Sequence, residues 1–276
     1  MTFGIFKKRF STIAQLRAGL DERAQIIRAR EATIRERERV VEQREEEIAT
    51  LQKCITRLKQ ELAQPPAFEK VIDLRATIVE TIPKLSGWCS ERKALLLSDL
   101  VLQNDVERAL EIGVFAGRSA VPVAMTMRYL KRGQLLAVEA WSNLVATAYP
   151  IDDEHDNWWA EVDLAAIKRE YFKSITKYDL TRHVSTLELS SDEAFAALST
   201  SSFDLIHIDG GHSEQQAIAD VQQWTSTLNK RGLAVVDDIF WPSMKPARAW
   251  LHATCEVVDE VCESEHVTYG IYRRRS

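Results

Sequence analysis

Residues 203–212 read FDLIHIDGGH, and residues 233–238 read LAVVDD. Each is a short apolar run that ends in aspartate, which is typical of a buried strand whose carboxyl end reaches a ligand-binding edge. Similar apolar runs lie at 109–114, 135–140 and 184–189, and helix-length stretches lie between the runs at 118–130, 163–177, 192–198 and 214–228. This alternation predicts an α/β fold with a doubly wound parallel sheet.

Further segments flank this pattern. Helix-like stretches at 68–82 and 91–102 precede the first strand, and two final runs, 256–261 and 267–272, surround a short polar turn. The turn predicts a closing antiparallel pair of strands. Because ligands of such sheets bind beyond the carboxyl ends of the strands, the candidate functional residues are those that end the strands.

Charge divides the 276 residues into unlike parts. Residues 65–276 carry 22 basic and 31 acidic groups, whereas residues 11–64 carry 11 and 10. An acidic main body argues against a nucleic-acid-binding surface, which needs a basic footprint. We therefore expect a basic and apolar segment at 1–10, a separate helical segment at 11–64 and one α/β domain at 65–276.

Membrane and redox signals are weak. No stretch approaches the 18 apolar residues of a membrane-spanning helix, and the first ten residues lack the apolar core of a secretion signal. The four cysteines form no CxxC pair, so a reducing cytoplasm is the simplest interpretation. Residues 3–10 could touch an anionic membrane weakly and place the protein at its periphery, although a frayed basic end is the simpler interpretation.

Residues 11–64 show a strict seven-residue repeat, which predicts a long coiled-coil helix and a homo-oligomer. Every a position is apolar, namely Ile13, Leu20, Ile27, Ile34, Val41, Ile48, Ile55 and Leu62. The middle d positions are instead arginine, at Arg23, Arg30, Arg37 and Arg44. These arginines could extend out of the seam, set the register, or await an acidic partner, and the sequence does not separate these alternatives. A further idea is that the whole segment docks the chain to a glycan-assembly partner or sets its distance from a membrane.

The first strand of the sheet ends in a glycine-rich turn, EIGVFAGRS at 111–119. Its spacing is neither GxGxxG nor a Walker loop, and the acidic Glu111 would repel a pyrophosphate. A cationic cofactor without a diphosphate suits it better. Glu139 ends the second strand, where a carboxylate can accept hydrogen bonds from both ribose hydroxyls. The structural alternative for the glycine-rich stretch is a tight strand-to-helix turn, and that for Glu139 is a solvated carboxylate at a strand end.

The strongest pattern joins Asp209 and His212 with Asp237 and Asp238. Adjacent parallel strands bring these residues to one sheet edge, where three carboxylates would favour a hard divalent cation. The imidazole of His212 is suited to take a proton from a hydroxyl. The alternatives are helix capping or a surface position for His212, and a turn that caps the next helix for Asp237 and Asp238. His207 lies inside its strand, so core packing is the better interpretation of that residue.

On these motifs, residues 68–274 resemble class I S-adenosylmethionine-dependent methyltransferases, whose fold is a Rossmann-like sheet of seven strands with an antiparallel last strand. The strand-end acids and the Asp-x-x-His of residues 209–212 resemble the metal-dependent O-methyltransferases of the macrocin (sugar) type, which are related to the catechol type. The resemblance implies Asp209, Asp237 and Asp238 as ligands of Mg²⁺ or Mn²⁺, with His212 as general base. The EAW at 139–141 departs from the usual Asp-Pro-Trp.

The resemblance also assigns cofactor positions. Methionine-side contacts are implied for Glu111, Gly113, Gly117 and Ser119, a ribose contact for Glu139 and an adenine contact for Ser191. The connection 141–162 has the length of an active-site lid. Tryptophans can stack on sugars, so candidate substrate contacts are Trp141, Trp158, Trp159 and Trp241, with lid packing as the alternative.

The leading functional hypothesis is methylation of a sugar hydroxyl in a glycan or glycosylated metabolite. A catechol-type small-molecule acceptor is the close alternative. A hypothesis of another class is a coiled-coil scaffold whose methyltransferase-like domain only binds its ligands.

Overall fold

The computed structural model describes residues 23, 30, 33–53 and 68–275. The chain divides into two compact units, Met1–Gln64 and Pro65–Ser276. Residues 33–53 of the first unit are helical, and their apolar a positions are exposed, with Ile34 at 55%, Val41 at 54% and Ile48 at 52%. The predicted membrane-contact segment, 3–10, lies outside the described residues.

The described ion pairs of this helix join residues three apart, Glu36 with Arg39 and Arg44 with Glu47. Arg44 has Glu45 as its neighbour in the repeat, but its guanidinium lies 2.7 Å from the carboxylate of Glu47. Both side chains are largely exposed, and the pair joins residues three apart on one helix. None of the described helices is both long and apolar enough to cross a bilayer.

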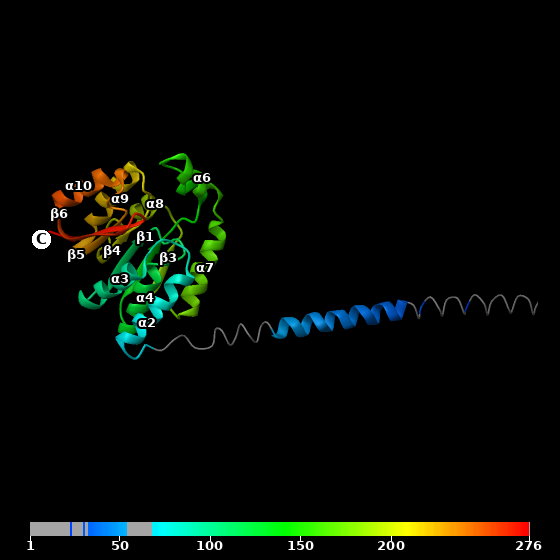
Figure 1. The fold of residues 1–276 in the computed structure, drawn as a ribbon. Coiled ribbons are helices and arrows are strands. Elements are labelled where there is room, and N and C mark those ends of the chain that lie inside the picture. The colour runs from blue at the N-terminus through cyan, green and yellow to red at the C-terminus, as the bar shows by residue number, and fades with distance from the viewer. Residues whose placement is uncertain (1–22, 24–29, 31–32, 54–67, 276) are drawn as a thin grey trace, which may run out of the picture. The chain divides into compact units, whose positions relative to one another are not determined.

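The second unit contains a seven-stranded sheet with the order β3-β2-β1-β4-β5-β7-β6 (Figure 1). Strands β1 to β5 are parallel, and β7 pairs antiparallel with both β5 and β6. The doubly wound sheet and its antiparallel closing strands are thus confirmed. The strands are β1 (Arg108–Ile112), β2 (Gln134–Val138), β3 (Val184–Leu187), β4 (Phe203–Ile208), β5 (Leu228–Asp237), β6 (Cys255–Ser264) and β7 (Val267–Arg274).

Helices cover both faces of the sheet, and each face has its own core. One core joins the sheet to α2 (Val71–Thr81), α3 (Glu91–Gln103), α4 (Ala120–Leu130) and α7 (Leu164–Lys177). The other joins it to α8 (Ser191–Leu198), α9 (Glu214–Ser226) and α10 (Lys245–Thr254). Successive strand residues point to opposite faces, so Ala109 belongs to the first core and Leu110 to the second.

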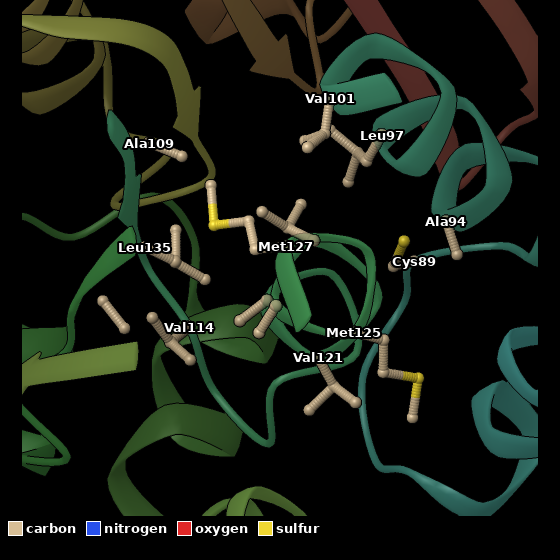
Figure 2. Packing of buried hydrophobic residues seen from close by; sticks show 14 of the residues in the cluster. Cys89, Ala94, Leu97, Val101, Ala109, Val114, Val121, Met125, Met127 and Leu135 are labelled. Atoms are coloured by element: carbon tan, nitrogen blue, oxygen red, sulfur yellow. The ribbon is translucent and has the colours of Figure 1, made fainter. Parts of the chain in front are cut away.

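Figure 2 shows the first core at the contact between α3, α4 and the strands. Met127 of α4 lies between Leu97 and Val101 of α3 and the strand residues Ala109 and Leu135, and all five are almost fully buried. Burying such side chains contributes roughly 1.5–3 kcal/mol each. This packing fixes α3 against the sheet, which matters below because α3 supplies a residue to the candidate site.

Two parts of the structure differ from the sequence prediction. The connection 141–162 contains two helices, α5 (Asn143–Ala146) and α6 (Asp153–Glu161), instead of a loop. Asp152 begins α6 by accepting a hydrogen bond from the amide of His155, and α6 has no fully buried residue, so it lacks the apolar periodicity that would reveal it. Strand β5 begins at Leu228, five residues earlier than expected, because Leu228 pairs with Phe203.

Candidate active site

The glycine-rich turn between β1 and α4 lies at the point where the sheet order reverses, between β1 and β4. Gly113 has a φ of 83°, and a Cβ there would come within 1.9 Å of the carbonyl oxygen of Asp209. Gly117 has a φ of 85°, and its Cβ would meet the ring of Tyr171 at 2.8 Å. Both positions therefore require glycine, and the turn lines the crevice that doubly wound sheets use for ligands.

Glu111 lies at the base of this crevice and is only 1% exposed. One of its carboxylate oxygens accepts a hydrogen bond from the hydroxyl of Ser119. The other oxygen is buried and has no hydrogen-bond partner among the described residues. A buried carboxylate oxygen without a partner is costly, so this position suits a cationic group of a bound ligand.

Glu139, at the end of β2, reaches across to the glycine-rich turn. One carboxylate oxygen accepts the amides of Val114 and Phe115 at 3.1 and 2.9 Å, and the other accepts the amide of Trp141 at 3.0 Å. Burial raises the pKa of Glu139, while these amides oppose the shift. A carboxylate offers about four lone-pair positions, so Glu139 retains capacity for a hydroxyl donor.

Ser191, the predicted adenine contact, begins α8 and has its hydroxyl engaged. It donates to Asp220 at 2.5 Å and accepts from the indole nitrogen of Trp224 at 2.8 Å. Asp220 also accepts from Gln216, and its second oxygen is buried without a partner among the described residues. The sequence analysis missed Asp220, because an acid within an amphipathic helix reads as part of the solvated face.

An inner group of charged residues surrounds Asp237, at the end of β5. We define it as Glu111, His207, Asp237 and Lys93. One oxygen of Asp237 lies 3.2 Å from Nε2 of His207, and the other accepts a hydrogen bond from the ammonium of Lys93. The Nδ1 atom of His207 lies 3.3 Å from Glu111, which links the inner group to the glycine-rich turn.

The charges of the inner group support one another. Burial alone would raise the pKa of Asp237, but Lys93 and His207 hold it well below its usual range. Burial and Lys93 lower the pKa of His207, but the contacts with Asp237 and Glu111 raise it to about 9. His207 was expected to be a core residue, and it is buried, yet it is also a charged partner of Asp237.

An outer group, which we define as Asp209, His212 and Asp238, lies beside the inner one and is less enclosed. The Nε2 atom of His212 is 3.1 Å from Asp238 and 3.9 Å from Asp209. The side chains of Asp209, His212 and Asp238 are 27%, 17% and 14% exposed. The structure thus brings together the four residues that sequence reasoning placed at one edge.

The pKa shifts in the outer group run opposite to those in the inner group: the outer carboxylates have raised pKa values and the outer histidine a lowered one. Burial and the charge of Asp237 raise the pKa of Asp209 and of Asp238 to about 7 each. Burial lowers the pKa of His212, so its imidazole is neutral near pH 7. Asp238 adopts a φ of 52°, and Phe115 and Trp141 are also left-handed, so three strained residues lie at strand ends around this edge.

The donors do not form the three-aspartate metal site that the resemblance implied. Two sets of donor atoms lie within 4.8 Å of one another, one formed by His207, Asp209 and Asp237 and the other by Asp209, His212 and Asp238. Neither set contains all three carboxylates. In the first set the ammonium of Lys93 contacts both Asp209 and Asp237, and in the second Nε2 of His212 lies within 3.9 Å of both Asp209 and Asp238. Both oxygens of Asp237 are engaged by Lys93 and His207. The residues therefore do not fit an ion held by all three aspartates.

The four candidate tryptophans fall into different environments. Trp141 is 8% exposed, and its indole N–H donates to the carbonyl of Phe115 at 3.0 Å, so it packs against the glycine-rich turn. Trp241 lies 5.3 Å from the ring of His212, beside the outer group. Trp158 is 43% exposed, whereas the indole N–H of Trp159 donates to His155 within α6.

An aromatic cluster joins three separate segments near the turn. Trp158 and Trp159 of α6 contact Phe115, with ring centroids 6.2 and 5.8 Å away, and Trp158 also contacts Trp88 at 5.3 Å. Trp88 precedes α3 and is 55% exposed. Sequence reasoning missed Trp88, because a lone tryptophan in a connection carries no periodic signal. Together these rings form an apolar surface against which a ring-shaped acceptor could pack.

Comparison with known proteins identifies the domain. Residues 110–239 match a family described as “Methyltransferase domain”, and this match contains the glycine-rich turn and both strand ends that carry the acid–histidine groups. This part of the chain is therefore a methyltransferase domain. A comparison with curated proteins finds no match to the sequence.

Solved structures share the fold. A putative O-methyltransferase from Klebsiella pneumoniae aligns with a TM-score of 0.53 and 16% identity over 76% of this chain and 92% of that chain. An O-methyltransferase from Bacillus cereus in complex with SAH gives 0.53 and 12% over 81% and 97%. TomG, an O-methyltransferase from Streptomyces achromogenes involved in tomaymycin synthesis, in complex with SAM, gives 0.51 and 13% over 79% and 95%. The chain thus has a fold that O-methyltransferases use, and residues 110–239 within it match the methyltransferase domain.

Proposed function

We propose that this enzyme transfers the methyl group of S-adenosylmethionine to a hydroxyl oxygen, and that the acceptor is a sugar of a glycan or of a glycosylated metabolite. One observation carries the proposal: Nε2 of His212 lies 3.1 Å from the carboxylate of Asp238, at the strand-end edge where Gly113 packs on the carbonyl of Asp209. This arrangement places a candidate base next to a candidate cofactor site.

The residues of the crevice fit S-adenosylmethionine. The unpartnered oxygen of Glu111 suits the cationic methionine portion, and Gly113 and Gly117 let the turn pack closely on Asp209 and Tyr171. Glu139 is the proposed acceptor for the ribose hydroxyls, and Ser191 lies on the proposed adenine side. The cofactor supplies an electrophilic methyl group on a sulfonium.

His212 is the proposed general base. If its Nε2–H donates to Asp238, the lone pair of Nδ1 is free to accept the proton of an acceptor hydroxyl. Asp238 thereby orients the ring and stabilises the imidazolium that forms, as carboxylates do beside catalytic histidines. The Trp241 ring beside His212 helps to exclude water from this proton transfer.

The acceptor class rests on the exposed aromatic rings. Trp158 and Trp88 offer flat apolar faces near the turn, which suit the C–H face of a sugar. The same rings could stack on an aromatic acceptor, so a catechol-type small molecule is the second candidate. Competition by simple catechols at equal concentration would favour that second candidate.

The proposed reaction can be tested with His212→Gln. We expect the rate of methyl transfer, measured by mass spectrometry of the acceptor, to fall by about 10²–10⁴-fold. This is the rate enhancement that a general base typically contributes. Binding of S-adenosylmethionine, measured by calorimetry, should be unchanged, since His212 is not among the proposed cofactor contacts. Full activity of the variant would remove His212 from the reaction.

The scaffold alternative makes the opposite prediction. A domain that only binds its ligands would transfer no methyl group to any acceptor tested, and a domain without a working cofactor site would not bind S-adenosylmethionine. His252→Gln is a matched control, because His252 pairs with Glu260 at 2.8 Å and belongs to neither acid–histidine group, and it should leave methyl transfer unchanged.

The helix at 33–53 has a proposed role of its own. Its exposed apolar row at Ile34, Val41 and Ile48 recurs every seven residues, which favours association with further copies of the same helix. Sedimentation of the full chain should then give a homo-oligomer. The proposed glycan-assembly partner would also bind this coiled-coil segment, whereas a place at the membrane periphery depends on residues 3–10, outside the described residues.

A further inference from the structure

Lys93 is the most enclosed cation of the described domain. It lies in the first turn of α3, its side chain is 2% exposed, and α3 is held against the sheet by the core around Met127. Its ammonium donates to Asp237 and lies 3.8 Å from the nearer oxygen of Asp209. Lysine is rarely buried so completely unless it is paired, so the two aspartates explain its position.

The contacts of Lys93 belong to a longer row in which acids and bases alternate. Its members in order are Glu111, His207, Asp237, Lys93, Asp209, His212 and Asp238. Each neighbouring pair lies within 3.9 Å. Every gap between two carboxylates is therefore filled by a nitrogen of this chain, from the glycine-rich turn to the proposed base.

We propose that Lys93 is the fixed cation of this site and takes the place of a divalent ion, so that methyl transfer by this enzyme requires no metal. Lys93 acts as a positioning residue: it neutralises Asp237 and Asp209 and thereby holds the ends of β5 and β4, which present Asp238 and His212. This inference rests on the proposed function, because it concerns how that same site is organised.

The geometry makes Lys93 and a divalent ion alternatives. An ion that bridged Asp209 and Asp237 would lie within a few ångströms of the buried ammonium, where repulsion between like charges is weakly screened. An ion held by Asp209 and Asp238 would also take Nε2 of His212 as a ligand, because the three donor atoms lie within 4.8 Å of one another. The ion would then replace the contact between Nε2 of His212 and Asp238, which orients the proposed base.

The first experiment uses the full-length protein without any substitution. Mg²⁺ and Mn²⁺ are titrated into chelator-treated protein by calorimetry, and methyl transfer is measured with EDTA and with each ion. We expect no binding tighter than millimolar and less than a twofold change in activity. Stoichiometric binding at micromolar concentration that Asp238→Asn abolishes, or a tenfold loss in EDTA that Mg²⁺ restores, would overturn the proposal.

Failure of the proposed function would look different. A protein that transfers no methyl group under any metal condition contradicts the O-methyltransferase proposal. The calorimetric titration still decides the metal question in that case, because it measures binding without turnover. A metal-requiring enzyme, in contrast, would keep the proposed function and lose only the role given to Lys93.

The second experiment creates a vacancy with Lys93→Ala. This variant leaves Asp237 and Asp209 without their ammonium, so its melting temperature should fall, and millimolar Mg²⁺ or methylammonium should restore several degrees of it. The wild-type protein should show no such response. Lys177→Ala is the matched control, because Lys177 ends α7 beside the ring of Tyr178 and is not part of the row.

The outcomes of the second experiment separate the roles of Lys93. Equal responses of wild type and Lys93→Ala to the added cations would overturn the proposal, since a purely structural lysine would not create a cation requirement. If Lys93→Ala does not fold, Lys93→Arg retains the charge and should keep the activity insensitive to EDTA. A metal requirement in the Arg variant would also overturn it.

Discussion

The inner and outer groups contain the adjacent residues Asp237 and Asp238, which have opposite electrostatic environments. Asp237 lies between Lys93 and His207, which hold its pKa well below the usual range, whereas burial and its neighbour raise the pKa of Asp238 to about 7. Asp237 is the last residue of β5, whereas Asp238 lies beyond the strand with a left-handed φ of 52°, and of the two only Asp237 contacts Lys93 and His207. The inner group therefore pairs its carboxylates with buried cations, while the outer group has carboxylates with raised pKa values and is the proposed place of proton transfer.

The largest expected effect comes from Asp237→Ala. This change leaves the ammonium of Lys93 and the charged ring of His207 buried without their common partner. Loss of one member of a buried ion pair costs about 3–5 kcal/mol of unfolding free energy, which corresponds to a melting temperature lower by roughly 10 °C for a domain of this size. Urea denaturation of the full chain measures the effect.

Asp238→Ala is the matched control for that experiment. Its carboxylate contacts His212 alone among the described charged groups at hydrogen-bond distance, so it should cost about 1 kcal/mol or less. Equal losses of stability in the two variants would contradict the division into inner and outer groups.

Asp220 sharpens the comparison, because it is a buried carboxylate with only neutral hydrogen-bond donors. Burial raises its pKa to about 6, above the value near 3.8 of an exposed aspartate. The folded state therefore binds the proton more tightly than the unfolded state, so stability increases as the pH falls from about 7 to 4. The shift is equivalent to roughly 2–3 kcal/mol.

The variant Asp220→Asn removes this titration. Relative to that variant, the wild-type protein should become more stable between pH 7 and pH 5, as measured by urea denaturation at both values. Other titrating groups are common to the two proteins and cancel in the difference. A difference that does not change with pH would show that Asp220 has an ordinary pKa.

The smallest expected effect concerns the exposed ion pair of Arg44 and Glu47. Its side chains are 71% and 49% exposed, so water and salt screen their attraction. The buried pair of Lys93 and Asp237 is screened much less. Glu47→Gln should change helix stability by less than about 0.5 kcal/mol, as followed by circular dichroism during thermal unfolding. A loss as large as that of Asp237→Ala would mean that burial does not govern the difference.

The sequence predicted the sheet and one half of the site, for the same physical reason. Apolar runs ending in Asp209 and Asp237 are local signals, and parallel neighbouring strands necessarily bring their carboxyl ends together. His212 and Asp238 follow directly from the same strand ends. The solved structures confirm the fold, and the family match places a methyltransferase domain at residues 110–239, while the metal and the acceptor stay predictions.

Lys93 could not be predicted in this way. It is 144 residues away from Asp237 in sequence, and in the stretch ERKALLLSDL it resembles one more charge on the polar face of an amphipathic helix. Its burial depends on how α3 packs on α4 and the sheet, which is a tertiary property. Trp88 and Asp220 were missed for similar reasons, since neither belongs to a periodic or strand-end pattern.

Glu139 carries a consequence for how this enzyme could change over time. Its carboxylate binds amides on two different loops, those of Val114 and Phe115 and that of Trp141, besides its proposed contact with the ribose. The proposed recognition of the nucleoside would therefore be coupled to the integrity of the glycine-rich turn. A substitution at this position cannot alter cofactor preference alone, and any redesign for a modified ribose would need a second residue to restrain the turn.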